Sequence, residues 1–230
     1  MSLKSSTNPP HYIMLQTIFN SKGLVEAGCD EAGRGCLAGP VYAAAVILPL
    51  DIEQRCPELA QGLNDSKQLS EKKRYALRTL IERKAVAYAV AALDNHKIDR
   101  LNILRASITA MHRALDGLSV RPAHIIVDGN RFYPYHDPCD PESAVPSTTI
   151  VKGDGKYMSI AAASILAKTY RDDYMLDIHR QYPQYHWDSN KGYPSKAHRE
   201  SIRQFGVTPY HRKTFNLLGE SLQLEFDFGI

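Results

Sequence analysis

The sequence predicts an α/β protein in which a mixed central sheet is flanked by helices, with a C-terminal helical extension. Two features of the pattern favour this class: three strand-like runs come first along the chain, and strands then alternate with helices. The third is composition, because 43% of the 230 residues are hydrophobic and 23% are charged, which is typical of a globular chain with a sizeable core. At this length we expect one domain with appended segments.

Five segments are predicted to be strands because they are apolar or β-branched runs bounded by turn residues. They are residues 24–31, 41–48, 85–93, 124–127 and 148–151. The short link between the first two strands predicts an antiparallel hairpin. The fourth strand is apolar throughout, which is typical of a strand buried on both faces.

Three segments have the spacing of helices. Ser70 is the expected N-cap of a helix that ends near residue 84, and Glu71 is favourable in its first turn. Residues 98–118 predict one long amphipathic helix, because apolar residues recur along one face. Ser159 is the expected cap of a third helix, which ends near residue 182.

Four parts of the chain differ in composition. We expect an N-terminal extension at 1–20, a catalytic core at 21–182, a basic substrate-binding segment at 183–215 and an acidic tail at 216–230. Residues 179–215 contain seven Lys and Arg residues but only two acids, whereas the tail has three acids and no Lys or Arg. A basic segment is compatible with a polyanionic partner, although a solvated helical face has a similar composition.

The cysteines and the apolar runs exclude several protein classes. Cys29, Cys36, Cys56 and Cys139 lack the spacing of a zinc site or a disulfide framework, so we expect reduced thiols in a cytoplasmic protein. No apolar run follows basic residues at the N-terminus, so no signal peptide is expected. No run reaches the roughly 20 apolar residues that cross a bilayer, so no membrane association is expected.

One stretch, residues 29–35, places two adjacent carboxylates next to an arginine bracketed by glycines. Asp30 and Glu31 repel each other and are costly to bury without a cation, which favours a metal site. The loop behind them offers backbone amides and a guanidinium that can grip phosphate or sugar. Taken alone, a solvated turn explains the stretch equally well. Because adjacent strand residues point to opposite faces, both acids can share a site only if the strand breaks at Glu31.

Two further acids occur in matching contexts. Asp128 follows the fourth strand, at the edge where α/β sheets place ligands, although Asp-Gly-Asn is also favourable turn chemistry. Asp172 shares a helix face with Ile165 and Leu176, so it interrupts an apolar stripe and needs a partner. Lys168, four residues earlier, is the structural alternative for that partner.

Together these acids predict a metal centre. Asp30, Glu31, Asp128 and Asp172 form an oxygen-only ligand set, which favours Mn²⁺ or Mg²⁺ over zinc. Two such ions, about 4 Å apart, would activate water and stabilise the leaving oxygen of a phosphodiester.

The chain resembles the type 2 ribonucleases H, specifically the bacterial ribonuclease HII family. The resemblance rests on an ordered set of motifs: residues 30–35 (DEAGRG), 64–67 (NDSK), 127–130 (VDGN), 162–168 (AAASILAK) with 171–172 (RD), 191–194 (KGYP) and 211–212 (HR). The match covers about residues 25–215. The loop at 132–147 is longer than the core of the family needs, and the tail beyond 215 lies outside the match.

The resemblance implies a ribonuclease H-like fold and endonucleolytic cleavage of the RNA strand of RNA–DNA hybrids. It also implies incision 5′ of single ribonucleotides in duplex DNA, leaving 3′-hydroxyl and 5′-phosphate ends. By the resemblance, the metal-binding and catalytic carboxylates are Asp30, Glu31, Asp128 and Asp172.

The resemblance also implies the substrate-binding residues. Gly33, Arg34 and Gly35 would read the 2′-hydroxyl and the adjacent phosphate, where glycine permits close approach. Tyr193 would stack on the next sugar, but a loop aromatic held by the following proline is the alternative. Lys67 would contact a phosphate, but a surface lysine beside a helix is the alternative.

The tail suggests a protein partner. Residues 223–228 (QLEFDF) resemble the Gln-Leu-x-Leu-x-Phe peptides that dock on bacterial sliding clamps, with Phe226 where Leu is usual. The hypothesis is a tether to the clamp, and the alternative is a tail that packs back on the domain.

Two other functions stay open at this point: another metal-dependent nuclease on a ribonuclease H-like scaffold, and a non-enzymatic nucleic-acid-binding module. Four acids are electrostatically unhelpful for merely binding a polyanion, which disfavours the module. We expect a monomer. The sequence leaves open whether ribonucleotide excision or primer removal in DNA replication is the cellular role.

Overall fold

The computed structural model describes residues 15–63 and 69–219, so Lys67 and the tail motif at 223–228 lie outside the described residues. The central sheet has the strand order β3-β2-β1-β4-β7. Its strands are β1 (Glu26–Ala32), β2 (Val41–Ile47), β3 (Ala87–Leu93), β4 (His124–Asp128) and β7 (Ser147–Ile150). β1, β2 and β3 pair antiparallel, whereas β4 is parallel to both β1 and β7. The predicted mixed sheet and its hairpin are therefore confirmed.

The register of β1 creates an opening at its carboxyl end. β1 pairs with β4 only as far as Cys29 opposite Val127, but it continues along β2 until Ala32 opposite Tyr42. The strand therefore does not break at Glu31, so a break is not the condition for Asp30 and Glu31 to share a site, and both line the same hollow. β1 and β4 part instead, and their ends face a shared space at the carboxyl edge, where ligands commonly bind.

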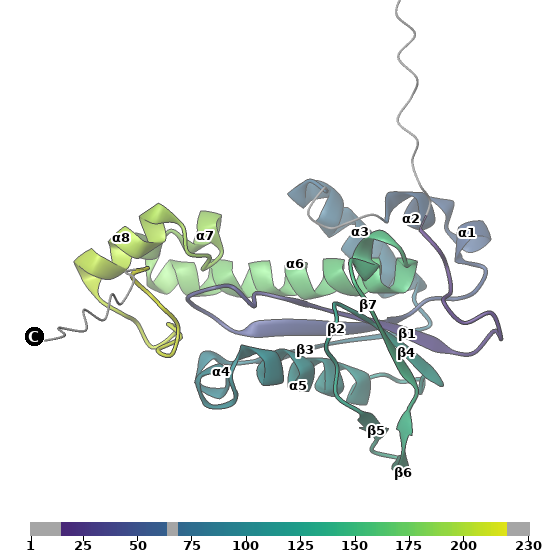
Figure 1. The fold of residues 1–230 in the computed structure, drawn as a ribbon. Helices are drawn as coiled ribbons and strands as arrows, with labels where there is room; N and C mark the ends of the chain where they lie inside the picture. The colour runs from purple at the N-terminus through teal and green to yellow at the C-terminus, as the bar shows by residue number, and fades with distance from the viewer. Residues whose placement is uncertain (1–14, 64–68, 220–230) are drawn as a thin grey trace, which may run out of the picture.

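Helices cover both faces of the sheet (Figure 1). On one face lie α6 (Met158–Gln181), α3 (Glu71–Lys84) and the short α1 (Ile52–Arg55) and α2 (Pro57–Gly62). On the other face lie α4 (Asn95–Leu101) and α5 (Ile103–Asp116). A Cβ at Gly28 would collide with the backbone of Ser159, so α6 lies directly on β1. Each face has its own apolar cluster, one around Leu166 and the other around Val127.

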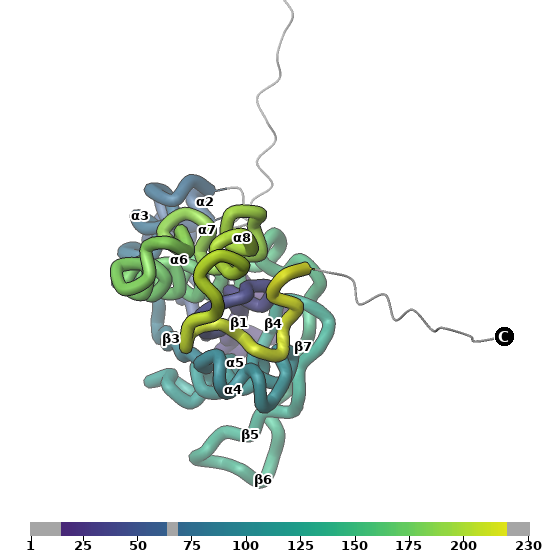
Figure 2. Tube along the Cα trace, turned by 90° about the vertical axis from the view of Figure 1, so that its left-hand side faces the viewer, coloured from purple at the N-terminus to yellow at the C-terminus, as the bar shows by residue number. Residues whose placement is uncertain are grey.

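The C-terminal segment closes one end of the molecule. It contains the turn η2 (Pro183–Tyr185) and the helices α7 (Trp187–Asn190) and α8 (Lys196–Phe205). Figure 2 shows it crossing the end of the sheet, from the α6 side to the side of α4 and α5. Trp187 is fully buried there in one apolar cluster with Leu37 and Met175, so the segment packs on the core.

Three local expectations need revision, and one is confirmed. Ser70 caps α3 by accepting a hydrogen bond from the Lys73 amide, as predicted. The expected helix at 98–118 is broken at Asn102, whose φ of 64° ends α4 and whose side chain caps α5. Ser159 does not cap α6, because the N-cap position is Tyr157. The loop at 132–147 contains an additional hairpin, β5 (Tyr135–Asp137) and β6 (Asp140–Val145).

Candidate active site

A hollow of about 410 Å³ lies at the carboxyl edge where β1 and β4 part. It combines the ends of both strands with the loop after β1, one face of α6 and the loop before α8. Its lining residues are Asp30, Glu31, Ala32, Gly33, Arg34, Gly35, Asp128, Ser164, Lys168 and Tyr193. The structure therefore brings together three of the four predicted acids, the whole glycine–arginine loop and Tyr193.

Asp30 has the least favourable environment for a negative charge among these acids. Its side chain is buried, and burial is the main cause that raises its carboxyl pKa well above the usual range. The negative charges of Glu31 and Asp128 raise the pKa further, whereas hydrogen bonds from Ser164 and the Glu31 amide oppose the shift. Three carboxylates therefore repel one another in one small space. A bound cation would offset this repulsion.

Glu31 has a cation within reach. Arg34 Nη1 donates to Glu31 Oε1 at 3.1 Å. Burial raises the pKa of Glu31, the Arg34 guanidinium opposes that shift, and Asp128 adds to it. Half of the Arg34 side chain is exposed, so it faces both the acid and the solvent in the hollow.

Asp128 is oriented by the backbone. Its Oδ1 accepts a 2.6 Å hydrogen bond from the amide of Gly153, in the short turn η1 (Gly153–Gly155) after β7. This bond holds the carboxylate at the end of β4, beside the opening that faces Asp30.

Asp172 lies farther along α6 and does not line the hollow. Burial raises its pKa, and the positive charges of Lys168, Lys191 and Arg171 oppose that shift. Among the described residues, no ion pair within 4.0 Å joins Lys168 to Asp172, so the predicted structural pairing is absent. Ser164, Lys168 and Asp172 follow each other at intervals of four, which puts them on one helix face. That spacing is the signal that would have pointed to Ser164 and Lys168 as site residues.

The two loop glycines differ in their surroundings. Gly33 has a φ of +93°, and a Cβ there would collide with the Arg171 side chain, so only glycine fits. Gly35 has no described atom within 4 Å of where its Cβ would lie, so its backbone is open to a ligand.

Two buried arginines hold this loop from behind, and the sequence reasoning gave them no role. Arg212 donates to the carbonyls of Gly33 at 2.7 Å, Arg34 at 2.9 Å and Gly39 at 3.0 Å. Arg171 donates to Pro40 at 3.0 Å and to Lys191 at 2.8 Å. Their guanidiniums thus cross-link the segment at 33–40 with the loop that carries Tyr193.

Tyr193 presents its ring to the hollow and is 43% exposed. Its carbonyl accepts a 2.9 Å hydrogen bond from Nδ1 of the fully buried His198. With Nδ1 as a donor, His198 Nε2 accepts from Trp187 Nε1 at 3.0 Å and lies 3.3 Å from His211 Nε2. This network fixes the backbone of Tyr193. The ring lies 6.0 Å from the Arg171 guanidinium, and its exposed part faces the hollow.

No preformed metal cage exists in the described part of the chain: no three His, Cys, Asp or Glu side chains already surround an ion position. The donor set nevertheless fits a hard cation, because carboxylate oxygens face a hollow in which they repel each other.

The described residues also contain no helix that could cross a membrane. Four described cysteines are free thiols, and three of them are buried.

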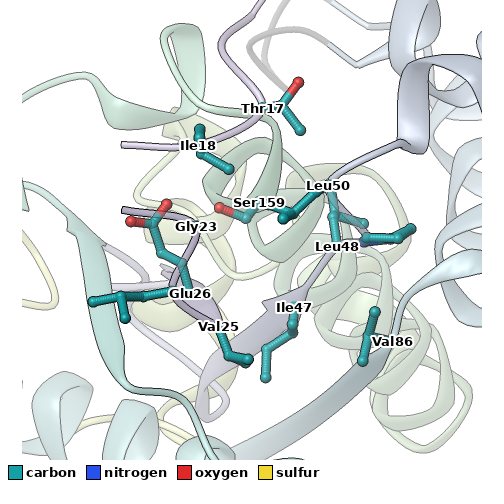
Figure 3. A pocket seen from close by; sticks show the side chains of 12 residues that line it. Thr17, Ile18, Gly23, Val25, Glu26, Ile47, Leu48, Leu50, Val86 and Ser159 are labelled. Carbon is teal, nitrogen blue, oxygen red and sulfur yellow. The ribbon is translucent and has the colours of Figure 1, made fainter. Parts of the chain in front are cut away.

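A second hollow, of about 140 Å³, lies at the opposite end of β1 and does not resemble this site (Figure 3). Its lining is mainly apolar, with Leu48, Leu50 and Val86 among it. The Glu26 carboxylate at its edge is already engaged by the Phe19 amide and His124 Nδ1, each at 3.0 Å. This hollow therefore offers no free carboxylate for catalysis.

A model of the family described as "Ribonuclease HII" matches residues 27–218 of this chain. The chain belongs to the ribonuclease HII family. A ribonuclease HII of Phocaeicola vulgatus is 62% identical over 208 residues, covering 90% of this chain and 97% of that protein. One of Parabacteroides distasonis is 63% identical over 204 residues, covering 89% and 96%. The chain is thus a type 2 ribonuclease H, and the non-enzymatic module is set aside.

Solved structures agree with the fold. The ribonuclease H2 of Pyrococcus horikoshii matches with a TM-score of 0.68 and 26% identity, covering 84% of this chain and 94% of that one. A Bst-RNase HIII solved in complex with Mn²⁺ matches at 0.65 and 20%, covering 85% and 68%. The RNase HII in a PCNA complex from Archaeoglobus fulgidus matches at 0.65 and 23%, covering 86% and 98%. The ribonuclease H-like fold expected from the sequence is confirmed.

Proposed function

We propose that this chain hydrolyses the RNA strand of RNA–DNA hybrids and incises duplex DNA 5′ of single embedded ribonucleotides. The cut leaves 3′-hydroxyl and 5′-phosphate ends. One observation carries the proposal: three carboxylates, the Gly33–Arg34–Gly35 loop and the exposed ring of Tyr193 line a single hollow. Carboxylates supply the chemistry for a phosphodiester, whereas the loop and the ring supply the means to read a sugar.

Divalent ions, Mn²⁺ or Mg²⁺, would be held by Asp30, Glu31 and Asp128, with Asp172 joining from α6. When bound, two such ions supply the positive charge that activates a water and stabilises the leaving oxygen. The chain's own contribution is orientation: the Gly153 amide fixes Asp128, while Ser164 and the Glu31 amide fix Asp30. The raised pKa of Asp30 supports this assignment, because its carboxylate lacks a compensating charge.

Selection for RNA rests on the loop after β1. The open backbone at Gly35 permits the close approach that a 2′-hydroxyl contact needs, and Arg34 can turn from Glu31 to the adjacent phosphate. Tyr193 would stack on the sugar of the following deoxynucleotide and so sense the junction. Lys67, from the segment outside the described residues, would contact a backbone phosphate.

The test is cleavage of an end-labelled DNA duplex that carries one ribonucleotide, with Mg²⁺, with Mn²⁺ and with chelator. We expect one metal-dependent cut on the 5′ side of the ribonucleotide, which Asp128→Asn abolishes while duplex binding persists. Cutting confined to longer hybrids would remove the roles of Arg34 and Tyr193. Absence of cutting on both substrates would overturn the proposal.

A second candidate is another metal-dependent nuclease activity on the same scaffold. It would use the same acids but would not need the glycine–arginine loop or Tyr193. Equal cleavage of all-DNA and ribonucleotide-containing duplexes by the wild-type protein would favour it.

We also propose that the tail tethers the enzyme to a sliding clamp. The support is the motif at 223–228, and the archaeal RNase HII solved in a PCNA complex is a precedent from a distant protein. A pull-down with purified bacterial clamp tests it: unchanged clamp binding after deletion of residues 221–230 would exclude the tether. The cytoplasmic location and the monomeric state stay predictions.

A further inference from the structure

A groove of about 410 Å³ lies on the α5 face of the sheet, outside the hollow with the carboxylates. It is lined by Leu101, Arg105, Thr109 and Tyr133, from α4, α5 and the loop after β4. Tyr133 is 44% exposed and Leu101 is 36% exposed. We propose that this groove binds the sugar–phosphate backbone of the substrate duplex several base pairs from the cut, an inference that rests on the proposed function.

Charge complementarity supports a polyanion in this groove. Between Arg100 and Leu115 the chain has three arginines and no acid, and the loop adds Arg131. None of Arg100, Arg105 and Arg131 forms an ion pair with a described residue, whereas six other arginines of the described chain pair with an acid. Of these arginines, Arg105 lines the groove together with the exposed Tyr133 ring. A guanidinium without an acid partner beside an aromatic ring is typical of surfaces that contact phosphate and sugar.

The sheet register places the groove at the same end of the molecule as the carboxylates. Leu93, the last residue of β3, pairs with Val41, and the neighbouring Tyr42 pairs with Ala32 at the end of β1. α4 and the start of α5 therefore begin at the edge where Glu31 lies. Tyr133 is five residues after Asp128, so at most about 17 Å of extended chain separates them, or about five base pairs of duplex.

The groove is held in shape by its surroundings. The Tyr133 carbonyl lies 3.2 Å from Nε2 of His112 on α5, and the Phe132 ring packs edge-on against His112 at 5.1 Å. Figure 1 shows α5 and the hairpin β5–β6, which follows this loop, on the same side of the sheet. The tyrosine ring and the arginine are thus presented from two fixed elements.

The basic C-terminal segment connects with this face. The Asn95 side chain donates to the carbonyls of Pro209 at 2.8 Å and His211 at 3.1 Å, and Asp99 accepts from the Thr214 amide at 3.1 Å. α4 is therefore docked on the segment that crosses the end of the sheet (Figure 2). A duplex that contacts the C-terminal segment and crosses the hollow could continue into the groove.

The test measures binding in chelator, so that no cleavage is required. The probe is a fluorescent DNA duplex with one ribonucleotide and about twelve base pairs on each side, titrated at about 50 and 200 mM salt. Arg105→Ala should weaken binding and lower the salt slope by about one, so that the defect shrinks three- to fourfold at the higher salt. Tyr133→Ala should weaken binding at both salt concentrations, and Tyr133→Phe should restore it because the ring is kept.

The matched control is Arg83→Ala, an exposed and unpaired arginine among the described residues, at the end of α3 on the opposite face. It should match the wild type in affinity and salt slope. Trimming the duplex to about three base pairs on one side should erase the Arg105→Ala defect for one of the two flanks. The proposal that the groove binds the duplex would be overturned if Arg105→Ala had the same affinity and salt slope as Arg83→Ala and wild type. If the wild type binds the duplex but never cuts it with metal, the proposed function fails while the groove stands.

Discussion

At the scale of single residues, Gly33 and Gly35 lie in different surroundings. Both belong to the motif that carries the family resemblance, and that resemblance implies a substrate role for both. The structure separates them, because Gly33 packs on Arg171 at a positive φ whereas Gly35 faces open space. A motif does not show which of its residues contact a ligand. A glycine needed for packing and a glycine needed for ligand approach look the same in the sequence.

This difference predicts opposite behaviour for two alanine variants. Gly33→Ala should destabilise the fold by about 1–3 kcal/mol, because its Cβ displaces a buried arginine from a strained position. Gly35→Ala should leave the unfolding midpoint unchanged but weaken cleavage at embedded ribonucleotides. Urea unfolding and cleavage assays on both variants check this. A destabilised Gly35→Ala would show that the open space is needed for folding.

We predict that the charged Asp30 carboxylate destabilises the folded protein and that a bound cation offsets this effect. The raised pKa of Asp30 means that the folded protein binds a proton more readily than the unfolded chain, so stability falls as the pH rises from the ordinary carboxyl pKa up to the raised pKa of the folded state. In chelator near neutral pH, Asp30→Asn should therefore melt at a higher temperature than wild type, with the difference vanishing near pH 4. Mn²⁺ should raise the melting temperature of wild type more than that of the variant. Thermal unfolding measures both, and a variant less stable than wild type in chelator would contradict the argument.

At the scale of elements, the hydrophobic pattern predicted the strands to within a few residues, but it could not predict how their edges part. The pattern also read α4 and α5 as one helix, because both bury the same face and only the Asn102 backbone interrupts them. The hairpin β5–β6 was missed because its six-residue second strand is mostly exposed and lacks an apolar alternation. Contacts between distant segments, such as that of Arg212 with residues 33–40, have no local signal.

Arg212 is the strongest test of such a contact. Arg212→Met should destabilise the protein by on the order of 3 kcal/mol, because carbonyls of the 33–40 segment lose their buried donors. Arg180→Ala is the control, since its ion pair with Asp177 lies on the surface and should change stability by less than about 0.5 kcal/mol. Urea denaturation compares the two. Similar midpoints would show that the guanidinium contributes little.

We predict that the folded protein loses stability in acid because His211, which lies beside His198, is buried. Burial, helped by the neighbouring His198, lowers the pKa of His211 to about 4, so the folded protein keeps it neutral where the unfolded chain takes up a proton. Stability should therefore fall as the pH drops from about 6.5 to about 4, by on the order of 2 kcal/mol. His211→Gln should flatten this part of the profile. Urea midpoints across that range provide the measurement, and identical slopes would argue against His211.

At the scale of the whole molecule, the core and the basic C-terminal segment share one apolar cluster. The predicted boundary between residues 182 and 183 marks a change in composition, which the sequence can show. The composition says nothing about packing, because Leu37, between β1 and β2, and Met175, on α6, meet Trp187 only in the folded chain. We infer that the boundary separates roles in binding rather than units of folding.

The chain's one tryptophan makes this inference measurable. Trp187 lies in the C-terminal segment, so its fluorescence reports that segment, whereas far-UV circular dichroism reports mainly the core. Urea midpoints from the two signals should coincide, because the shared cluster couples the parts. An earlier fluorescence transition would show that the segment unfolds on its own.

The cross-linking of residues 33–40 by Arg171 and Arg212 has a thermodynamic consequence for recognition. A loop whose carbonyls are tied down when the chain folds has already lost its conformational entropy before any duplex arrives. The surface offered to a ribose is therefore preorganised, and little of the binding free energy is spent on ordering it. Loosening these cross-links would blur the distinction between ribose and deoxyribose more than it would weaken attraction to the duplex, since most of the positive charges proposed to attract the duplex lie outside this loop.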